Sequence, residues 1–238
     1  MMMTTTPLLS SSVSKRVVAS LLVRQSQKKT VLSSSNSSFS STSIRSISIG
    51  TNLIDDKITT LQSIRPWYMN DTEGSNKKID NARTMNDLFA SNKVVVMFGV
   101  PAPFTGTCTN EHYPGYKVLV DEFKKQGVHD IICYTVSDPY SHHAWSKALN
   151  KGDDEESNPT QIAFLADPDA SWAIKYGVDG ESRNVADKYA SFSLGRLNSI
   201  RFSMLVVDGK VKTFHVVDDA KKDAEKLLED VKQYNSEK

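Results

Sequence analysis

The clearest hydrophobic pattern begins at residue 94, where the run Val94-Val95-Val96-Met97-Phe98 is apolar at every position. A strand without polar alternation is typical of a sheet that is covered on both faces. After a loop rich in Pro, Gly and Thr, residues 108–126 show helical spacing, with an interruption expected at Pro114 and an end at Gly127. The inward positions of this helix are predicted to be Tyr116, Leu119, Val120 and Phe123.

Strands and helices alternate along the rest of the body. Strands are expected over residues 128–136 and 162–166, and helices over residues 139–149 and around 171–176. Two further strands, 201–207 and 211–217, flank Asp208-Gly209, which is a strong hairpin signal. A charged amphipathic helix is expected from Asp219 to about Tyr234. This order predicts an α/β fold with a central mixed β-sheet flanked by helices.

The first 54 residues differ in composition from the rest of the chain. They contain 16 serines, six Lys or Arg and no Asp or Glu, which is typical of an organelle transit peptide and not of a packed domain. Apolar residues at helical spacing form one face of a basic amphipathic helix, namely Val13, Val17, Val18, Leu21 and Leu22. We therefore predict a disordered transit peptide over residues 1–54 and a single domain over residues 55–238.

The amphipathic form of this segment favours a mitochondrial address. A chloroplast address is the alternative, because the Ser-rich, acid-poor peptides of the two organelles overlap, and a plain tail would leave the protein in the cytoplasm. The most apolar stretch, residues 17–23, is far shorter than the roughly 20 residues that span a bilayer. No membrane partner is expected.

Charge and cysteine content argue against a nucleic-acid partner, a disulfide framework and a zinc site. The chain carries 29 Lys and Arg against 28 Asp and Glu, and residues 55–238 keep 23 of these basic side chains and all of the acids. A mildly acidic body does not attract nucleic acid, so this partner is not expected. Cys108 and Cys133 are too few for a disulfide framework and lack the spacing of a zinc site.

The position of Cys108 suggests a reactive thiol. A lone cysteine is usually an inert buried residue. Cys108, however, follows a buried strand and lies in the first turn of the expected helix, where free backbone N–H groups and the helix dipole favour a thiolate. Redox loops with two cysteines read C-x-x-C at this point, but residues 105–108 read Thr-Gly-Thr-Cys, so disulfide exchange within the loop is excluded.

The sequence around Cys108 resembles the active site of the peroxiredoxins. Residues 101–108, Pro-Ala-Pro-Phe-Thr-Gly-Thr-Cys, match the motif P-x-x-x-T-x-x-C. Further segments agree in order and spacing with the peroxiredoxin-5 or type II (atypical) subfamily, namely Phe98-Gly99-Val100-Pro101, His112-Tyr113-Pro114-Gly115-Tyr116, Ser137-Asp138-Pro139 and Ala144-Trp145. The resemblance covers roughly residues 60 to 235. It implies a thioredoxin fold.

This resemblance implies a thiol-specific peroxidase that reduces hydrogen peroxide and organic hydroperoxides in cell redox homeostasis and the oxidative stress response. Cys108 would attack the peroxide as a thiolate and become a sulfenic acid. The Thr105 hydroxyl would orient the peroxide, Pro101 would shield the sulfur from water, and Arg201 would stabilise the thiolate and the leaving group. From the sequence alone Arg201 reads as an ordinary edge-strand cation, so only the resemblance gives it this role.

A few positions depart from the family pattern. Gly106 replaces a proline, Pro103 stands where the residue is normally small, and Thr109 stands where serine is common, so the stiffness of the loop is expected to differ. Asn198 occupies a position at which plant-like members often carry a second arginine, and Arg196 is the nearby candidate to replace it. The three changes in the loop, at Gly106, Pro103 and Thr109, remove no group with a chemical role.

The sequence leaves open how the sulfenic acid is reduced. Cys133 lies 25 residues after Cys108, a spacing found in plant type II members, so it is a candidate resolving cysteine. We favour the simpler interpretation of a buried strand residue, because a central strand does not easily bring its sulfur to a helix start. Reduction by external glutaredoxin with glutathione, or by thioredoxin, is then expected, without a cofactor. A homodimer is implied by the resemblance alone.

The five histidines suggest no metal or haem site. His129 and His215 have no acidic or cysteine partner at ligand spacing, His112 is expected to pack at the helix entry, and His142 and His143 to lie on a helix surface. The competing function is a thioredoxin-fold redox sensor or holdase, in which Cys108 signals to partner thiols. Sustained peroxide consumption with a regenerating thiol system would distinguish the two.

Overall fold

The computed structural model describes residues 46–54, 60–62, 82–90, 92–151, 162–180 and 198–238. In residues 60–62 and 82–86 only the main chain is described. The expected transit peptide, apart from residues 46–54, and Arg196 lie outside the described residues.

A mixed sheet of seven strands forms the centre of this body, in the order β2-β1-β5-β4-β3-β6-β7. Its strands are β1 (Thr60–Gln62), β2 (Ala82–Thr84), β3 (Val94–Gly99), β4 (Asp130–Thr135), β5 (Ile162–Ala166), β6 (Phe202–Val207) and β7 (Lys210–Val216). Its helical elements are α2 (Met85–Phe89), the π-helical turn η2 (Cys108–His112), α3 (Tyr113–Lys125), α4 (Pro139–Leu149), α5 (Ser171–Tyr176) and α6 (Asp223–Ser236).

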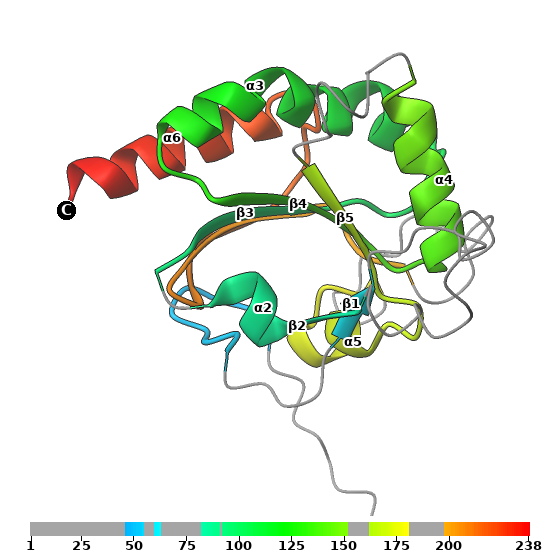
Figure 1. Ribbon diagram of the computed structural model, residues 1–238, viewed down its shortest axis with the longest axis horizontal. Helices are drawn as coiled ribbons and strands as arrows, with labels where there is room; N and C mark the ends of the chain where they lie inside the picture. The colour runs from blue at the N-terminus through cyan, green and yellow to red at the C-terminus, as the bar shows by residue number, and fades with distance from the viewer. Residues whose placement is uncertain (1–45, 55–59, 63–81, 91, 152–161, 181–197) are drawn as a thin grey trace, which may run out of the picture. The chain divides into compact units, whose positions relative to one another are not determined.

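The strands β3, β4 and β5 run parallel, whereas β6 pairs antiparallel with β3, and β7 with β6. The predicted hairpin turns at Asp208 and Gly209, whose φ angles of 50° and 72° suit the tight turn that joins two antiparallel strands. Helices cover both faces of the sheet, with α3, α4 and α6 on one face and α2 and α5 on the other (Figure 1). The expected α/β fold with a mixed sheet flanked by helices is confirmed.

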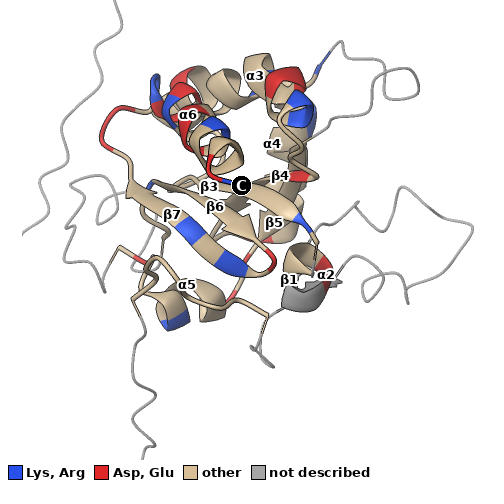
Figure 2. Ribbon diagram, turned by 90° about the vertical axis from the view of Figure 1, so that its left-hand side faces the viewer, with Lys and Arg blue, Asp and Glu red and all other residues tan. Residues whose placement is uncertain are grey.

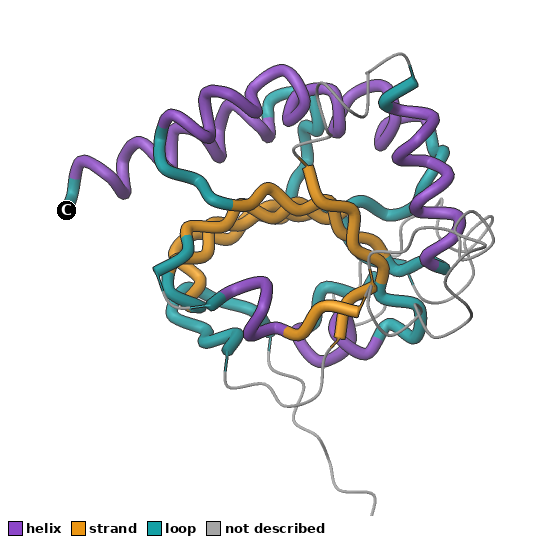
Figure 3. The backbone as a smooth tube through the Cα atoms, in the orientation of Figure 1, coloured by secondary structure: helices purple, strands orange, loops and turns teal. Residues whose placement is uncertain are grey.

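Each face of the sheet carries its own apolar core. The backbone trace shows the sheet lying between the helices of the two faces (Figure 3). Because successive side chains of a strand point to opposite faces, Val96 and Phe98 pack beneath α3 and α6, while Val95 and Met97 pack toward α5. Every residue of β3 is buried, which explains its unbroken apolar run. We call the two sides the α3/α6 face and the α5 face.

Residues 46–54 belong to this folded body. Ile47 and Leu53 are buried in the core of the α5 face. The Leu53 N–H donates to the carbonyl of Gly209 at 2.7 Å, and the Val211 N–H donates to the carbonyl of Thr51 at 2.9 Å. The compact unit that contains these residues spans residues 42–238. The boundary expected after residue 54 therefore moves to a point before residue 46, because it would cut off packed side chains.

The helix that follows the cysteine loop continues through Pro114. In η2 the Tyr113 N–H bonds to the carbonyl of Cys108, five residues earlier, and α3 then carries Pro114 in its first turn. A proline lacks the N–H that a helix interior needs, and the wide turn before it lets the helix continue without the expected interruption. The predicted inward positions are correct, since Tyr116, Val120 and Phe123 are buried and Leu119 packs partly against them.

Most other elements agree with the sequence prediction. The ranges of α4, β5 and α5 match, while α6 begins at Asp223 and not at Asp219 because residues 220–222 form a turn. Acidic and basic residues are interspersed along α3 and α6, and Lys residues mark the edge strand β7 (Figure 2). Among the helices that the structure describes, none has both the length and the apolar character needed to cross a membrane.

Candidate active site

Cys108 is the first residue of η2 and directly follows the loop after β3. Its side chain is in the core of the α3/α6 face, with only 1% of its surface exposed. It forms no disulfide. The structure therefore places a free thiol at the start of a helical segment, as the sequence predicts.

Arg201 is the residue just before β6, and its side chain reaches this sulfur. Its Nη2 donates to Cys108 Sγ at 3.6 Å. The main chain around Arg201 is held on both sides, since the Val217 N–H donates to the Arg201 carbonyl at 3.0 Å and Ser199 Oγ donates to the carbonyl of Val100 at 2.6 Å. The structure thus brings together two predicted site residues that are far apart in the sequence.

The loop between β3 and η2 orients the motif threonine. Thr105 Oγ1 donates to the carbonyl of Ala102 at 3.0 Å, and the Thr109 N–H donates to the carbonyl of Thr105 at 2.9 Å. Because the single hydroxyl proton is engaged, the Thr105 oxygen remains available as an acceptor. Phe104, just before it, has φ +60° and an exposed ring. This conformation is uncommon for a residue with a side chain, so the loop has a sharply defined turn here.

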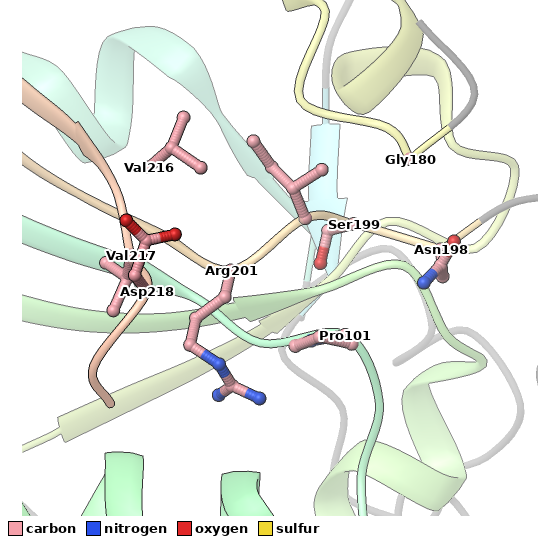
Figure 4. A pocket seen from close by; sticks show the side chains of 9 residues that line it. Pro101, Gly180, Asn198, Ser199, Arg201, Val216, Val217 and Asp218 are labelled. Atoms are coloured by element: carbon pink, nitrogen blue, oxygen red, sulfur yellow. The ribbon is translucent and has the colours of Figure 1, made fainter. Parts of the chain in front are cut away.

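Pro101 and Arg201 line an open pocket of about 220 Å³. Figure 4 shows Pro101 beside the Arg201 side chain and Ser199 close to Pro101, while Asn198 lines the pocket further away. The residues that line this pocket include the arginine that contacts the sulfur, but neither Cys108 nor Thr105. Asn198 is buried, and its Oδ1 has no hydrogen-bond partner among the residues that the structure describes.

A chain of buried polar groups continues from Arg201 away from the sulfur. Arg201 Nη1 lies 3.2 Å from His112 Nδ1, and His112 Nε2 lies 2.8 Å from Asp223 Oδ2. Asp223 also accepts hydrogen bonds from the hydroxyls of Tyr116, at 2.5 Å, and Ser203, at 2.7 Å. The site therefore extends from η2 through β6 to the start of α6.

The surroundings shift the pKa values within this chain. Burial has the largest effect on His112 and, with the positive charge of Arg201, lowers the pKa of this imidazole, although Asp223 acts in the opposite direction. Burial by itself would raise the pKa of Asp223, but the hydrogen bonds from His112, Tyr116 and Ser203 outweigh it, and this pKa is lowered. A neutral imidazole and a charged carboxylate follow at neutral pH.

Cys133 shares a core with Cys108 but has a different setting. It lies in the middle of β4, opposite Phe98 of β3 and Phe164 of β5, and is fully buried. Burial, and then the negative charge of Cys108, raise the pKa of the Cys133 thiol well above its ordinary value. The favoured interpretation of Cys133 as a buried strand residue is confirmed, and no disulfide joins the two sulfurs.

The other histidines have structural settings. His142 was expected on a helix surface, but this was wrong, since it is buried and stacks on Trp145. Burial lowers the pKa of His142 to about 3. His215 forms a 2.6 Å pair with Asp230 of α6. Within the described parts of the chain, no three His, Cys, Asp or Glu side chains are grouped so as to hold a metal ion.

Sequence reasoning missed the polar chain behind Arg201. His112 was assigned to packing alone, although its position four residues after Cys108 places both on one side of a helix and is a usable signal. Asp223 lies 111 residues from its partner His112, so no local pattern connects the two. An acid at the start of a helix is ordinarily explained by the helix dipole.

Known proteins resemble this chain along most of its length. The Redoxin family profile matches residues 70–231. "Peroxiredoxin-2F, mitochondrial" of Arabidopsis thaliana is 32% identical over 178 residues, which cover 74% of this chain and 78% of that protein. The protein of the same name from Oryza sativa subsp. japonica is 31% identical over 179 residues, covering 75% and 80%.

Solved structures agree. The reduced Prx3 of Vibrio vulnificus in complex with hydrogen peroxide has a TM-score of 0.60 and 29% sequence identity, and the match covers 79% of this chain and 98% of that one. This similarity confirms the thioredoxin-like arrangement of sheet and helices. The chain therefore belongs to the redoxin family and, within it, to the type II peroxiredoxins, which are thiol peroxidases.

Proposed function

We propose that this peroxiredoxin reduces hydrogen peroxide and organic hydroperoxides with Cys108 as its nucleophile. The observation that carries the proposal is the 3.6 Å contact from Arg201 Nη2 to Cys108 Sγ, because a guanidinium at this position stabilises a thiolate. The start of a helical segment adds a favourable dipole. The Vibrio vulnificus relative, solved with hydrogen peroxide, supports the same substrate class.

The proposed first step oxidises the sulfur by two electrons. The Cys108 thiolate attacks one peroxide oxygen, an S–O bond forms, and the O–O bond breaks. The other oxygen leaves with the electron pair, takes up a proton, and departs as water or as an alcohol. Cys108 remains as a sulfenic acid. Arg201 stabilises the charge first on the sulfur and then on the leaving oxygen.

In this proposal the loop between β3 and η2 orients the peroxide. The Thr105 hydroxyl donates its hydrogen bond to the carbonyl of Ala102. We therefore propose that the hydroxyl oxygen accepts a hydrogen bond from the peroxide O–H. Pro101 has no N–H and lines the pocket beside Arg201, which suits a wall that keeps competing water away from the sulfur. A site of this kind favours small peroxides, because the thiol itself is almost fully buried.

We propose that an external thiol, from glutaredoxin with glutathione or from thioredoxin, reduces the sulfenic acid. The thiol attacks the oxidised sulfur and releases water, and a second thiol then releases the mixed disulfide and restores Cys108. Cys133 is fixed by hydrogen-bonded neighbours on both sides of β4, and its raised pKa keeps it a thiol. Internal resolution therefore requires local opening of the central sheet.

The cellular setting is part of the same proposal. The relatives named mitochondrial and the basic, acid-free N-terminal segment support a mitochondrial enzyme in redox homeostasis and the response to oxidative stress. A homodimer is proposed by analogy with the family.

Peroxide consumption by matched cysteine variants tests the proposal. Cys108→Ser should abolish turnover with both the glutaredoxin and the thioredoxin systems, whereas Cys133→Ser should retain most of it with at least one of them. Circular dichroism of both variants controls for folding. Substantial turnover by Cys108→Ser would overturn the assignment of the nucleophile, and a stalled Cys133→Ser would favour the internal route.

A further inference from the structure

Asp223 is a carboxylate that is almost completely removed from water, with 1% of its side chain exposed. It accepts three hydrogen bonds, from His112, Tyr116 and Ser203. Burying a charge is costly unless hydrogen bonds satisfy it, and these three bonds satisfy the carboxylate of Asp223. The three donors come from η2, α3 and β6, and η2 also carries Cys108.

The contacts of His112 determine where its proton lies. A carboxylate only accepts hydrogen bonds, so His112 must carry a hydrogen on Nε2 to bond to Asp223. A guanidinium only donates, so His112 must present an unprotonated Nδ1 to Arg201. Only the neutral imidazole with hydrogen on Nε2 satisfies both. Asp223 thereby selects the tautomer that Arg201 needs.

This tautomer determines the direction of the guanidinium. Arg201 is held through Nη1 by His112 while Nη2 donates to the sulfur of Cys108. The planar guanidinium has fixed donor directions, so fixing one donor orients the other. If the imidazole carried its hydrogen on Nδ1, two donors would face each other, and Arg201 would have to turn away.

We propose that Asp223 is a positioning residue that, through His112, directs the guanidinium of Arg201 at Cys108. The inference rests on the proposed role of Cys108 as the reacting thiolate. Asp223 itself does not contact the sulfur in any hydrogen bond or ion pair of the described residues. Its two hydroxyl partners, Tyr116 and Ser203, keep the carboxylate from rotating away from His112.

The chain provides a matched control on the same helix. Asp230 lies seven residues further along α6 and also bonds to an imidazole, that of His215 of β7, at 2.6 Å. Asp223→Ala and Asp230→Ala thus remove the same kind of pair from the same helix, but only the first is linked to Arg201. In Asp223→Asn, the amide oxygen can still accept from His112 while the Ser203 hydroxyl rotates to accept from the amide nitrogen.

The rate of peroxide consumption, as kcat/KM for hydrogen peroxide, measures the linkage. Asp223→Ala should lose about ten- to a hundredfold, as expected when a reacting group is misplaced. Asp223→Asn should recover most of this loss, and Asp230→Ala should stay within about twofold of the wild type. In an Arg201→Ala background the Asp223→Ala change should have no further effect beyond about twofold.

Two results would overturn the inference. One is an Asp223→Ala rate equal to that of Asp230→Ala, and the other is an undiminished Asp223→Ala loss in the Arg201→Ala background, which would indicate a general structural role. If Cys108→Ser retains activity, the proposed function fails instead, and the two failures are distinct.

A spectroscopic measurement on the wild-type protein tests the linkage without relying on activity. Nitrogen-15 NMR of the wild-type imidazole rings, with His112 assigned by its absence in His112→Gln, should show a neutral His112 with hydrogen on Nε2. A His112 with hydrogen on Nδ1, or a charged imidazolium at neutral pH, would contradict the inference.

Discussion

The two faces of the sheet each bury an aspartate that holds a tyrosine, and the two aspartates behave differently. On the α3/α6 face, Asp223 accepts from Tyr116 at 2.5 Å. On the α5 face, Asp167 accepts from Tyr134 at 2.7 Å and from the N–H of Ala173 at 2.9 Å. Asp223 has three side-chain donors, whereas Asp167 Oδ1 has no hydrogen-bond partner in the described part of the chain.

This difference in hydrogen bonding separates their pKa values. Burial, and to a lesser extent the neighbouring carboxylate of Asp169, raise the pKa of Asp167 to about 6, because its two hydrogen bonds compensate only partly. Burial acts on Asp223 in the same direction, but its hydrogen bonds outweigh it and lower the pKa. The molecule keeps a permanent charge on the face that carries Arg201 and Cys108. On the other face the carboxylate of Asp167 takes up a proton at about pH 6, and no catalytic group contacts it among the described residues.

The largest expected effect is the loss of stability when core residues are removed from the α5 face alone. Deleting residues 1–54 removes Ile47 and Leu53 from the α5 face, which should destabilise the fold by about 3 to 6 kcal/mol from lost burial alone. Deleting residues 1–45 should leave stability and activity unchanged. Urea unfolding of both truncations measures the difference. Equal stability of the two truncations would show that residues 46–54 do not contribute to the core.

A smaller effect concerns the pH dependence of the stability that Asp167 on the α5 face contributes. The pKa of Asp167 is raised in the folded state from 3.8 to about 6, so its contribution to stability is present below pH 3.8 and is lost as the pH rises to about 6. The expected loss is about 3 kcal/mol. Asp167→Asn should remove this dependence, because the amide stays neutral throughout.

Urea unfolding of Asp167→Asn and the wild type between pH 4 and pH 7 isolates this effect, since groups such as His142 titrate alike in both proteins and cancel. The variant should gain relative stability toward pH 7, while its peroxidase activity stays within about twofold of the wild type. A difference that does not change with pH, or a loss of activity as large as that of Asp223→Ala, would contradict the contrast between the faces.

The next effect concerns the chemistry of the α3/α6 face. Arg201→Ala removes the charge-assisted contact to Cys108, so the barrier to attack on peroxide should rise by about 1.5 to 3 kcal/mol. The rate of attack should then fall roughly ten- to a hundredfold. Stopped-flow measurement of the oxidation step gives this rate directly. An unchanged rate would reduce Arg201 to a structural cation.

The fold was largely predictable because its main elements carry long periodic patterns. The buried run of β3 and the four inward positions of α3 were read correctly from spacing. The short elements β1, β2 and α2 contain three to five residues each and offer no period to detect. Residues 46–54 were grouped with the tail because composition gives no sign that Ile47 and Leu53 pack against distant strands.

The site was predictable only where its residues are local. Pro101, Thr105 and Cys108 lie within one loop, and the motif identifies them. Arg201 required the family resemblance, because its contact with Cys108 spans 93 residues. Asp223 has neither a motif nor a local partner, and only the fold brings it to His112.

Mass spectrometry after one equivalent of hydrogen peroxide, with a sulfenic acid trap such as dimedone present, tests the role of Cys108 as the nucleophile most directly. Cys108 should carry the trapped sulfenic acid and Cys133 should remain an unmodified thiol, because only Cys108 is contacted by Arg201. Oxidation of Cys133 with Cys108 unmodified would show that Cys108 is not the nucleophile.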